Sequence, residues 1–477
     1  MSMFNFKRNL CLNTDSYKVT HWLQFPVGAT HSSYYIESRG GEYDELMFAG
    51  ITFVQRVLEK GITVADVKRA NKVYKKHFGA DYFNYEGWMM IAEKMDGKIP
   101  VKIKALDEGT VVPVKHALAV IENTVEGFHW LPGWLEMFLL RAVWYQTTVA
   151  TVSYHCKKAI VEYYDMTSDL TGADRALSIK TRLHDFGGRG VSSEESAGLG
   201  GSAHLYNFVG TDTVEALIFT QELFKEAEDF MPGFSIPARE HSTTTCYGRE
   251  GEMSAYMNSV TQFGKGIYAC VMDSYDYEEA IKAIAEGEIK DFIIEQGGTF
   301  VARPDSGNMV DNIMFALNEF GKRFGYTVNS KGYKVLHPSV RIIQGDEIHS
   351  HKDIRRVLSW MEANKWSAEN VAFGMGGGLL QLPNRDTLKF AMKMSAIKID
   401  GKWMEVYKSP KGAEWKKSKK GRLTLIWTGK EYQTVNTLID VFDWGQEILK
   451  LKLVNSEIVG MSTHEDVTTL SDMQAGV

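Results

Sequence analysis

Acidic side chains recur at similar corners along the middle of the sequence. At each corner a short apolar run ends and a helical pattern follows, and the acidic residues there are Asp185, Asp212, Asp273, Asp276, Asp305 and Asp346. Carboxylates gathered in one place suit sugar hydroxyls, a divalent cation or positive charge that develops in a transition state. Asp is also a common helix N-cap, so each of these residues alone could merely cap the next helix. The prediction of a functional site therefore rests on the six acidic residues taken together.

Two glycine-rich stretches add binding chemistry to this set. HDFGGRG, at 184–190, combines the aromatic face of Phe186 with the guanidinium of Arg189 on a loose backbone. GMGGGLL, at 374–380, lies between an apolar run and a helical pattern. Its backbone N–H groups could surround a phosphate, although an ordinary tight turn has the same composition.

His241, which follows Glu240 in REHST, is the one prominent histidine of the corners. A neutral imidazole oriented by hydrogen bonds can act as a base or as a nucleophile toward phosphorus. A lone histidine is more often structural, so this role stays open on the residues alone. The sequence has neither G-x-S-x-G nor H-E-x-x-H, and therefore gives no support to a serine hydrolase or a zinc protease.

The corners must be positioned by a repeated strand-then-helix unit. They are LHDFGGRG, VGTDTVEAL, PAREHS, YACVMDSYD, FVARPDSGN, RIIQGDEI and VAFGMGGGLLQ. This repetition predicts parallel strands joined by crossover helices, with about enough strands to close an irregular TIM-like α/β barrel; an open doubly wound sheet is the alternative. In both folds the loops after the strands lie on one face, where distant residues converge.

The remaining sequence predicts a second unit with an antiparallel sheet. Residues 64–78 have helical spacing, and residues 101–123 alternate in two runs broken by DEG. Residues 129–152 predict a buried helix pair with a break at its Pro-Gly dipeptide. Residues 398–429 show strand-like alternation around a lysine-rich loop. We therefore predict an α/β (α+β) sandwich domain from residues 1–150 and 391–477, and a barrel domain from residues 151–390.

Composition limits the partners and the compartment. A chain of 477 residues that is 44% hydrophobic can bury a large core. Its net charge of -6 gives no general attraction to nucleic acid or to anionic membranes, so phosphate must be held by local donors. The four cysteines lack C-x-x-C spacing, and no signal peptide or long uncharged apolar run is present. These features predict a cytoplasmic protein.

Several motifs in order resemble one family. They are TDSYKVTH, HDFGGRGVSSEESAGLGGSAHLYNFVGTDTV, EHSTTT, DSYD, RPDSGN, QGD and FGMGGGLLQ. From about residue 8 to the C-terminus, the sequence is similar to the nicotinamide phosphoribosyltransferases, which are type II phosphoribosyltransferases. The resemblance implies synthesis of nicotinamide mononucleotide (NMN) and pyrophosphate from nicotinamide and phosphoribosyl pyrophosphate (PRPP), for NAD salvage. It also implies Mg²⁺ held mainly through pyrophosphate, ATP hydrolysis through a phosphohistidine, and a homodimer with shared active sites.

The resemblance assigns a pyridine slot. Phe186 would form one face, and Tyr17 of a second subunit, from the TDSYK segment that also holds Asp15, would form the other. Arg189 and Arg303 would surround the ring, its carboxamide or the adjacent phosphates. Asp212 would accept a hydrogen bond from the amide and repel the carboxylate of nicotinate, which favours nicotinamide.

The resemblance also assigns the sugar, phosphate and catalytic positions. Asp305 and Asp346, joined by the backbone of Gly345, would bind ribose hydroxyls, and Gly376 and Gly377 would hold the 5′-phosphate. Basic positions around the phosphates would be Arg39, Arg385, Lys393 and Lys408. The residue phosphorylated by ATP would be His241, with Glu240 and Asp273 as candidates to orient it and Asp273 near the pyrophosphate end.

Two positions depart from the vertebrate members of the family. Gly188 stands where they carry Tyr, and Ala391 stands where they have Ser. We expect altered affinity rather than a changed reaction. Three other functions compete: a nicotinate phosphoribosyltransferase, against which Asp212 argues; a non-catalytic nucleotide-binding dimer; and a barrel aldolase, for which the corners supply no Schiff-base lysine.

Overall fold

The computed structural model describes residues 3–409, 411, 417–440 and 445–477, which form two units. Unit 1 comprises Met1–Thr151, Glu222–Glu226 and Asn384–Leu470, and unit 2 comprises Val152–Gln221, Ala227–Pro383 and Ser471–Val477. The lysine-rich loop expected within 398–429 lies partly outside the described residues. In the part of the chain that is described, we find no helix with the length and apolar character needed to cross a bilayer.

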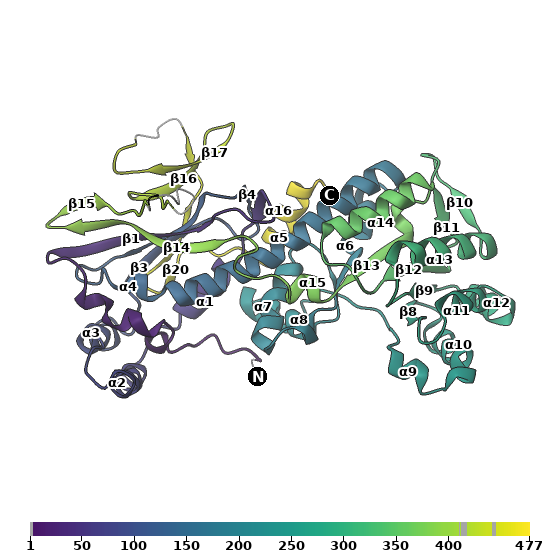
Figure 1. Ribbon diagram of the computed structural model, residues 1–477, viewed down its shortest axis with the longest axis horizontal. Helices are drawn as coiled ribbons and strands as arrows, with labels where there is room; N and C mark the ends of the chain where they lie inside the picture. Colours follow the sequence, from purple (N-terminus) through teal and green to yellow (C-terminus); the bar gives the residue numbers. More distant parts are fainter. Residues whose placement is uncertain (1–2, 410, 412–416, 441–444) are drawn as a thin grey trace. The chain divides into compact units, whose positions relative to one another are not determined.

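Unit 1 is built on a seven-stranded antiparallel sheet in the order β15-β14-β1-β5-β3-β19-β20 (Figure 1). Its centre pairs β1 (Ala29–Ser38) with β14 (Phe390–Ile399) on one side and β5 (Ala117–Asn123) on the other. The C-terminal segment thus adds strands to a sheet that the N-terminal segment begins. The other strands of the unit are β2 (Glu45–Met47), β3 (Val101–Ala105), β4 (Val111–Pro113), β15 (Lys402–Glu405), β16 (Leu423–Trp427), β17 (Tyr432–Asn436), β18 (Gln446–Glu447), β19 (Lys450–Val454) and β20 (Glu457–Ile458).

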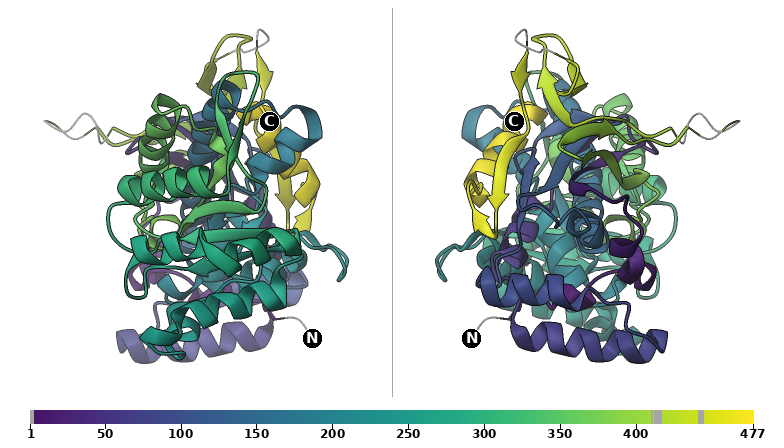
Figure 2. Two further views of the ribbon diagram at one scale, coloured as in Figure 1. Left: turned by 90° about the vertical axis from the view of Figure 1, so that its right-hand side faces the viewer. Right: turned by 90° about the vertical axis from the view of Figure 1, so that its left-hand side faces the viewer.

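The helices of unit 1 follow local sequence signals. Helix α2 (Val64–Phe78) covers the residues predicted for it: it begins at a capping box between Thr63 and Asp66 and ends at Gly79, whose φ is +67°. It packs beside α3 (Tyr85–Lys94), as Figure 2 shows. The other helices that lie wholly or partly in this unit are α1 (Ile51–Leu58), α4 (Leu131–Trp134), α5 (Glu136–Thr167), α8 (Val214–Phe224) and α16 (His464–Ala475).

The helix pair predicted over 129–152 is present as α4 and the start of α5. The two helices are not divided at the Pro-Gly dipeptide, where the break was expected. The Pro132–Gly133 pair lies inside α4, and the two helices separate at Leu135. Proline is tolerated in the first turn of a helix because the N–H that it lacks has no intrahelical partner there. The Pro-Gly pair therefore starts a helix instead of dividing one.

Unit 2 contains a six-stranded parallel sheet in the order β7-β6-β13-β12-β9-β8. Its strands are β6 (Leu183–Asp185), β7 (Gly210–Thr211), β8 (Ile267–Val271), β9 (Thr299–Arg303), β12 (Val340–Gln344) and β13 (Val371–Met375), and a separate hairpin pairs β10 (Tyr326–Val328) with β11 (Lys334–Leu336). The helices are α6 (Gly172–Lys180), α7 (Glu194–His204), α9 (His241–Thr245), α10 (Glu252–Phe263), α11 (Tyr277–Ile284), α12 (Gly287–Gln296), α13 (Met309–Arg323), α14 (His351–Ala363) and α15 (Gly377–Leu380).

A short segment, residues 234–239, joins the two ends of this parallel sheet. Phe234 forms a parallel bridge to Gly210 of β7, and Ala238 forms one to Ala269 of β8. We call residues 234–239 the closing segment. It turns the sheet into an irregular α/β barrel, as predicted, and excludes the open doubly wound alternative. The barrel interior is packed with small and branched side chains from four strands: Ala269, Val301, Ile343 and Ala372.

Candidate active site

The carboxyl ends of the parallel strands bring the predicted corner residues of unit 2 to one edge of the barrel. Phe186 follows β6, Asp212 follows β7, and Asp273 lies two residues after β8. The ends of the next strands carry Arg303 and Asp305, Gly345 and Asp346, and Gly376 and Gly377. Because the strands are parallel, residues separated by almost two hundred positions share this edge.

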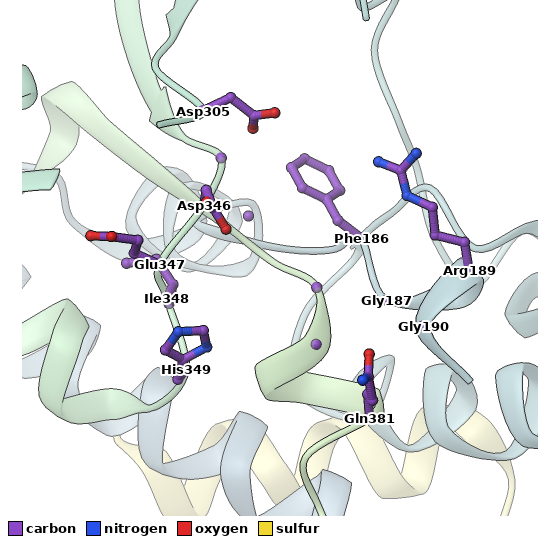
Figure 3. A pocket seen from close by; sticks show the side chains of 14 residues that line it. Phe186, Gly187, Arg189, Gly190, Asp305, Asp346, Glu347, Ile348, His349 and Gln381 are labelled. Carbon is purple, nitrogen blue, oxygen red and sulfur yellow. The ribbon is translucent and has the colours of Figure 1, made fainter. Parts of the chain in front are cut away.

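A polar pocket of about 380 Å³ opens at this edge (Figure 3). Seven of the predicted residues line it: Phe186, Arg189, Asp305, Gly345, Asp346, Gly376 and Gly377. Other residues that line the pocket were not predicted, among them Glu347, His349 and Gln381. Each of these is within five residues of a predicted position, so extending the corners along their loops would have found them.

The phenyl ring of Phe186 is placed by the strand beside it. The Phe186 N–H donates to the carbonyl of Met375 at 3.0 Å, and the ring packs against the apolar barrel interior. A Cβ on Gly374 would lie only 2.0 Å from Phe186 Cε2. Glycine at this position of β13 therefore gives the ring its room.

Asp185 supports the HDFGGRG loop from below. Its side chain is completely buried, and Oδ1 accepts the N–H of Gly187 at 2.7 Å. Burial raises the pKa of Asp185 to about 6, although the hydrogen bond from Gly187 opposes the shift. Asp276, by contrast, caps α11 by accepting the N–H of Glu279. For Asp276, the N-cap alternative describes the structure.

Asp212 lies next to this loop. Its backbone N–H donates to the carbonyl of Asp185 at 2.9 Å, and its carboxylate accepts a hydrogen bond from the hydroxyl of Ser235. The Asp212 side chain is exposed and lies outside the lining of the polar pocket. Its carboxylate is therefore open to a ligand at the neighbouring strand end.

His241 and Asp273 form a hydrogen-bonded pair at the other side of Asp305. His241 Nε2 lies 2.9 Å from Asp273 Oδ1, and Nδ1 lies 4.0 Å from Asp305 Oδ2. The side chain of Asp273 is only 6% exposed, whereas that of His241 is 47% exposed. A buried carboxylate thus holds one imidazole nitrogen and leaves the ring accessible.

Two neighbouring groups hydrogen-bond to Asp273 of this pair, whereas Glu240 hydrogen-bonds to another residue. Ser306, which the sequence analysis missed, donates its hydroxyl to Asp273 Oδ2, and the N–H of Asp305 donates to the same oxygen at 3.3 Å. The carboxylate of Glu240 accepts from Ser242. Of the two candidates to orient His241, Asp273 is the one whose carboxylate reaches the imidazole.

Arg303 lies at the end of β9, where its Nε is 3.8 Å from Asp305 Oδ1. One guanidinium nitrogen donates to the carbonyl of Arg239 at 3.2 Å. Arg303 lies outside the lining of the polar pocket, unlike Arg189. Its charged partner is Asp305, which lines the polar pocket and also lies 4.0 Å from His241 Nδ1.

Unit 1 carries the remaining predicted residues. Asp15 is the N-cap residue of a 3₁₀ helix, Ser16–Leu23, that holds Tyr17. The Tyr17 side chain is 61% exposed, and its ring meets that of His21 edge-on at 5.0 Å. An exposed aromatic face of this kind is available for stacking.

A basic cleft of about 1030 Å³ gathers most of the cationic candidates of unit 1. It is lined by the predicted residues Arg39, Arg385 and Lys393, and by Ala391, which differs from the Ser of the vertebrate enzymes. Further charged residues complete the lining: Glu37, Lys115, Glu136, Asp386, Lys389, Lys417 and Lys419. Burial lowers the pKa of Lys393, whose Nζ lies 3.6 Å from Glu136. Lys408 lies outside the lining described for this cleft.

No protein-only metal site is evident among residues 3–409, 411, 417–440 and 445–477: no three His, Cys, Asp or Glu side chains are grouped to hold an ion. Mg²⁺ is commonly held by one or two carboxylates together with substrate phosphates. Asp305 and Asp346 line the polar pocket and fit that kind of site.

Comparisons with solved structures define the class of fold. The whole chain superposes on nicotinate-nucleotide pyrophosphorylase from Pyrococcus furiosus with a TM-score of 0.64 and 16% identity, covering 98% of that structure. Human nicotinic acid phosphoribosyltransferase gives a TM-score of 0.58 and 16% identity over 97% of this chain and 93% of that one. The fold is therefore one that phosphoribosyl-handling enzymes use.

Sequence comparisons identify the family. Residues 181–446 match the nicotinate phosphoribosyltransferase (NAPRTase) family, and residues 9–103 match the N-terminal domain of nicotinamide phosphoribosyltransferase. The chain is 45% identical to nicotinamide phosphoribosyltransferase of Xanthomonas campestris pv. campestris over 91% of its length and 90% of the relative. It is 29% identical to that of Mycoplasma genitalium over 88% and 96% of the two chains. The chain belongs to the nicotinamide phosphoribosyltransferases, within the broader nicotinate phosphoribosyltransferase (NAPRTase) family, which confirms the resemblance drawn from its motifs.

Proposed function

We propose that this chain is a nicotinamide phosphoribosyltransferase, a pentosyltransferase that joins nicotinamide to the phosphoribosyl group of PRPP and releases pyrophosphate. The observation that carries the proposal is the 45% identity, over nine-tenths of both chains, to a relative with that name. The resulting NMN serves NAD salvage. The residues at the barrel edge would supply the groups that bind the base, the ribose and the 5′-phosphate.

Asp212 supports nicotinamide over nicotinate as the substrate. An ionised carboxylate accepts a hydrogen bond from a neutral amide and repels the carboxylate of nicotinate. Phe186, on the adjacent strand end, offers a flat apolar face for the ring, with Arg189 beside it. The proposed slot is completed by Tyr17 of the second protomer.

The transfer needs no protein nucleophile. The ring nitrogen of nicotinamide has a free lone pair, which attacks C1 of the ribose as the bond from C1 to pyrophosphate lengthens. Asp305 and Asp346 would hold the ribose hydroxyls and stabilise the oxocarbenium-like sugar, while Gly376 and Gly377 hold the 5′-phosphate through their backbone. Magnesium, held mainly by pyrophosphate oxygens, would supply positive charge at the leaving group.

The proposal includes ATP as a co-substrate that phosphorylates His241. The accessible imidazole nitrogen would attack the γ-phosphorus and displace ADP as the bond to the bridging oxygen breaks, while Asp273 holds the other nitrogen and stabilises the positive ring. The phosphorylated enzyme would bind its substrates more tightly. ATP hydrolysis would thereby offset an unfavourable equilibrium for synthesis.

The proposed assembly is a homodimer in the cytoplasm. Each active site would take the barrel edge of one protomer and basic residues of the unit 1 cleft, together with Tyr17, from the other. All four cysteines are unpaired, which fits a reducing compartment.

One assay tests the proposed activity. Purified protein is given PRPP and Mg²⁺ with nicotinamide or nicotinate, each with and without ATP, and both mononucleotides are quantified. We expect the amide product to form far faster than the acid product, and ATP to increase its yield. Equal rates would contradict the substrate assignment, and no mononucleotide would contradict the activity.

A further inference from the structure

Ser235 occupies a fixed position in the closing segment of the barrel. The residue before it, Phe234, bonds to the backbone on both sides of Gly210: its N–H donates to the carbonyl of Val209 at 2.6 Å, and its carbonyl accepts from the N–H of Thr211 at 3.1 Å. Ser235 is therefore held beside the residue that follows β7, which is Asp212. The Ser235 hydroxyl donates to Asp212 Oδ1.

The surroundings of Ser235 make this hydrogen bond distinctive. Ser235 lines an apolar cavity of about 380 Å³ inside the barrel, together with Ile236, Val301, Ile343 and Ala372. The cavity is also lined by the polar side chains of Thr181, Arg182, His184, Thr299 and Arg341, but each of these hydrogen-bonds to a backbone carbonyl. Within the described part of the chain, the Ser235 hydroxyl is therefore the donor found for Asp212 Oδ1, and no hydrogen bond reaches Oδ2, which leaves that oxygen for a ligand.

The type of donor also matters. A lysine or arginine in this position would orient the carboxylate but would neutralise its charge. A serine hydroxyl orients the carboxylate and leaves the negative charge in place. That combination suits a carboxylate that must accept a hydrogen bond from an amide and repel a second carboxylate.

We propose that Ser235 is a specificity-determining positioning residue, which orients Asp212 so that its free oxygen meets the carboxamide of nicotinamide and faces the carboxylate of nicotinate. This inference rests on the proposed function. Ser235 acts through Asp212, so its loss should affect discrimination between the two bases more than it affects the transfer step.

The test compares Ser235→Ala with Ser235→Thr, a variant that keeps the hydroxyl. We expect Ser235→Ala to lower kcat/KM for nicotinamide about tenfold through KM, with little change for nicotinate, because one charge-assisted hydrogen bond is lost. The ratio of the two kcat/KM values should narrow by the same factor. Ser235→Thr should restore most of the ratio.

The matched control is Thr299→Ala. Thr299 lines the same cavity, but its hydroxyl donates to the carbonyl of Pro338 at 2.9 Å. We expect this variant to keep the parent's ratio even if both rates fall. Melting temperatures of all variants, compared with the parent, separate loss of folding from loss of discrimination.

The outcomes distinguish the inference from the proposed function. If the parent prefers nicotinamide and Ser235→Ala keeps the same ratio, or loses both activities in parallel, the role of Ser235 is wrong and the proposed function stands. If the parent prefers nicotinate or uses neither base, the proposed function fails and the role of Ser235 falls with it.

Discussion

At the scale of single residues, two neighbouring carboxyl groups have different surroundings. Asp185 is completely buried beneath the HDFGGRG loop, where burial raises its pKa to about 6. Asp212 is exposed at the end of the next strand and accepts a hydrogen bond from Ser235. The first therefore shapes the loop that carries Phe186, and the second is free to meet a substrate.

Asp212→Asn tests the contribution of charge to substrate choice. The amide keeps the size of the side chain and a hydrogen-bond acceptor but removes the repulsion of nicotinate. We expect the nicotinamide-to-nicotinate ratio of kcat/KM to fall by roughly tenfold or more, since close like charges disfavour a ligand by more than 1 kcal/mol. If the kcat/KM ratio of the variant equals that of the parent, another residue discriminates between nicotinamide and nicotinate.

His241→Ala tests the coupling to ATP. Without the imidazole no phosphohistidine can form, so ATP should no longer increase the yield of NMN, while slow synthesis from PRPP continues. Product formation with and without ATP is compared for the variant and the parent. Stimulation that persists in the variant would place the phosphorylated residue elsewhere.

At the scale of secondary-structure elements, the site depends on how closely the parallel strands approach the loops. Strand β13 carries Gly374 directly against the ring of Phe186, and strand β7 is linked through Phe234 to the closing segment. Backbone spacing, as well as side-chain chemistry, therefore sets the geometry of the proposed pyridine slot.

Gly374→Ala should displace the ring of Phe186. The added Cβ would lie 2.0 Å from Phe186 Cε2, so the ring must move. We expect KM for nicotinamide to rise about tenfold, as a stacking contact is lost, with a smaller change in KM for PRPP. Gly266→Ala is the control, because its nearest neighbour would be 3.8 Å away. Unchanged KM for nicotinamide would argue against Phe186 as a face of the slot.

The element that carries Asp212 is also tied to a buried histidine. His204, at the end of α7, lies 2.9 Å from the hydroxyl of Ser153 and 3.1 Å from the carbonyl of Gly210. Nε2 must donate to the carbonyl of Gly210, because a carbonyl can only accept, and in a neutral ring Nδ1 then accepts from Ser153. Burial lowers the pKa of His204 to about 3.

Acid should therefore destabilise the fold through His204. Because the pKa of the folded state lies below the ordinary value, stability is complete above about pH 6.5 and is lost as the pH falls, by about 1.4 kcal/mol at pH 5.5. We expect the melting temperature of the parent to exceed that of His204→Gln at about pH 7.5, and this gap to narrow at about pH 5.5. A gap that does not change with pH would contradict a buried neutral imidazole.

At the scale of the whole molecule, the candidate residues are divided between two units. The barrel of unit 2 holds the polar pocket and His241, whereas unit 1 holds Tyr17 and the basic cleft. Because the net charge is -6, general attraction would not hold phosphate, and we propose that local donors such as this cleft do so.

Mixing inactive variants tests the proposed sharing of sites between protomers. Asp305→Ala and Arg385→Ala should each be nearly inactive alone. If each site takes Asp305 from one chain and Arg385 from the other, random co-assembly should restore about a quarter of the parent's activity. No recovery in mixed dimers, with dimers verified by sedimentation, would show that each site belongs to one chain.

Much of the barrel edge could be predicted from the sequence, because the residues of each corner indicate where a strand ends. The alternation of strand and helix predicted the barrel, and Phe186, Asp305 and Asp346 were predicted as neighbours. The closing segment was harder, since residues 234–239 form only isolated bridges and include Pro237. Ser235 was missed for that reason. The resemblance placed Lys408 with Arg39, Arg385 and Lys393 around the phosphates, whereas Lys408 lies outside the lining described for the cleft, because local sequence does not encode such long-range placement.

The most direct test of the account is a crystal structure with nicotinamide and a stable PRPP analogue bound. We predict that the pyridine ring stacks on Phe186, that its amide nitrogen lies within hydrogen-bond distance of the Asp212 carboxylate, and that the ribose hydroxyls contact Asp305 and Asp346. A pyridine ring bound away from Phe186, or an amide directed away from Asp212, would contradict the proposed nicotinamide slot.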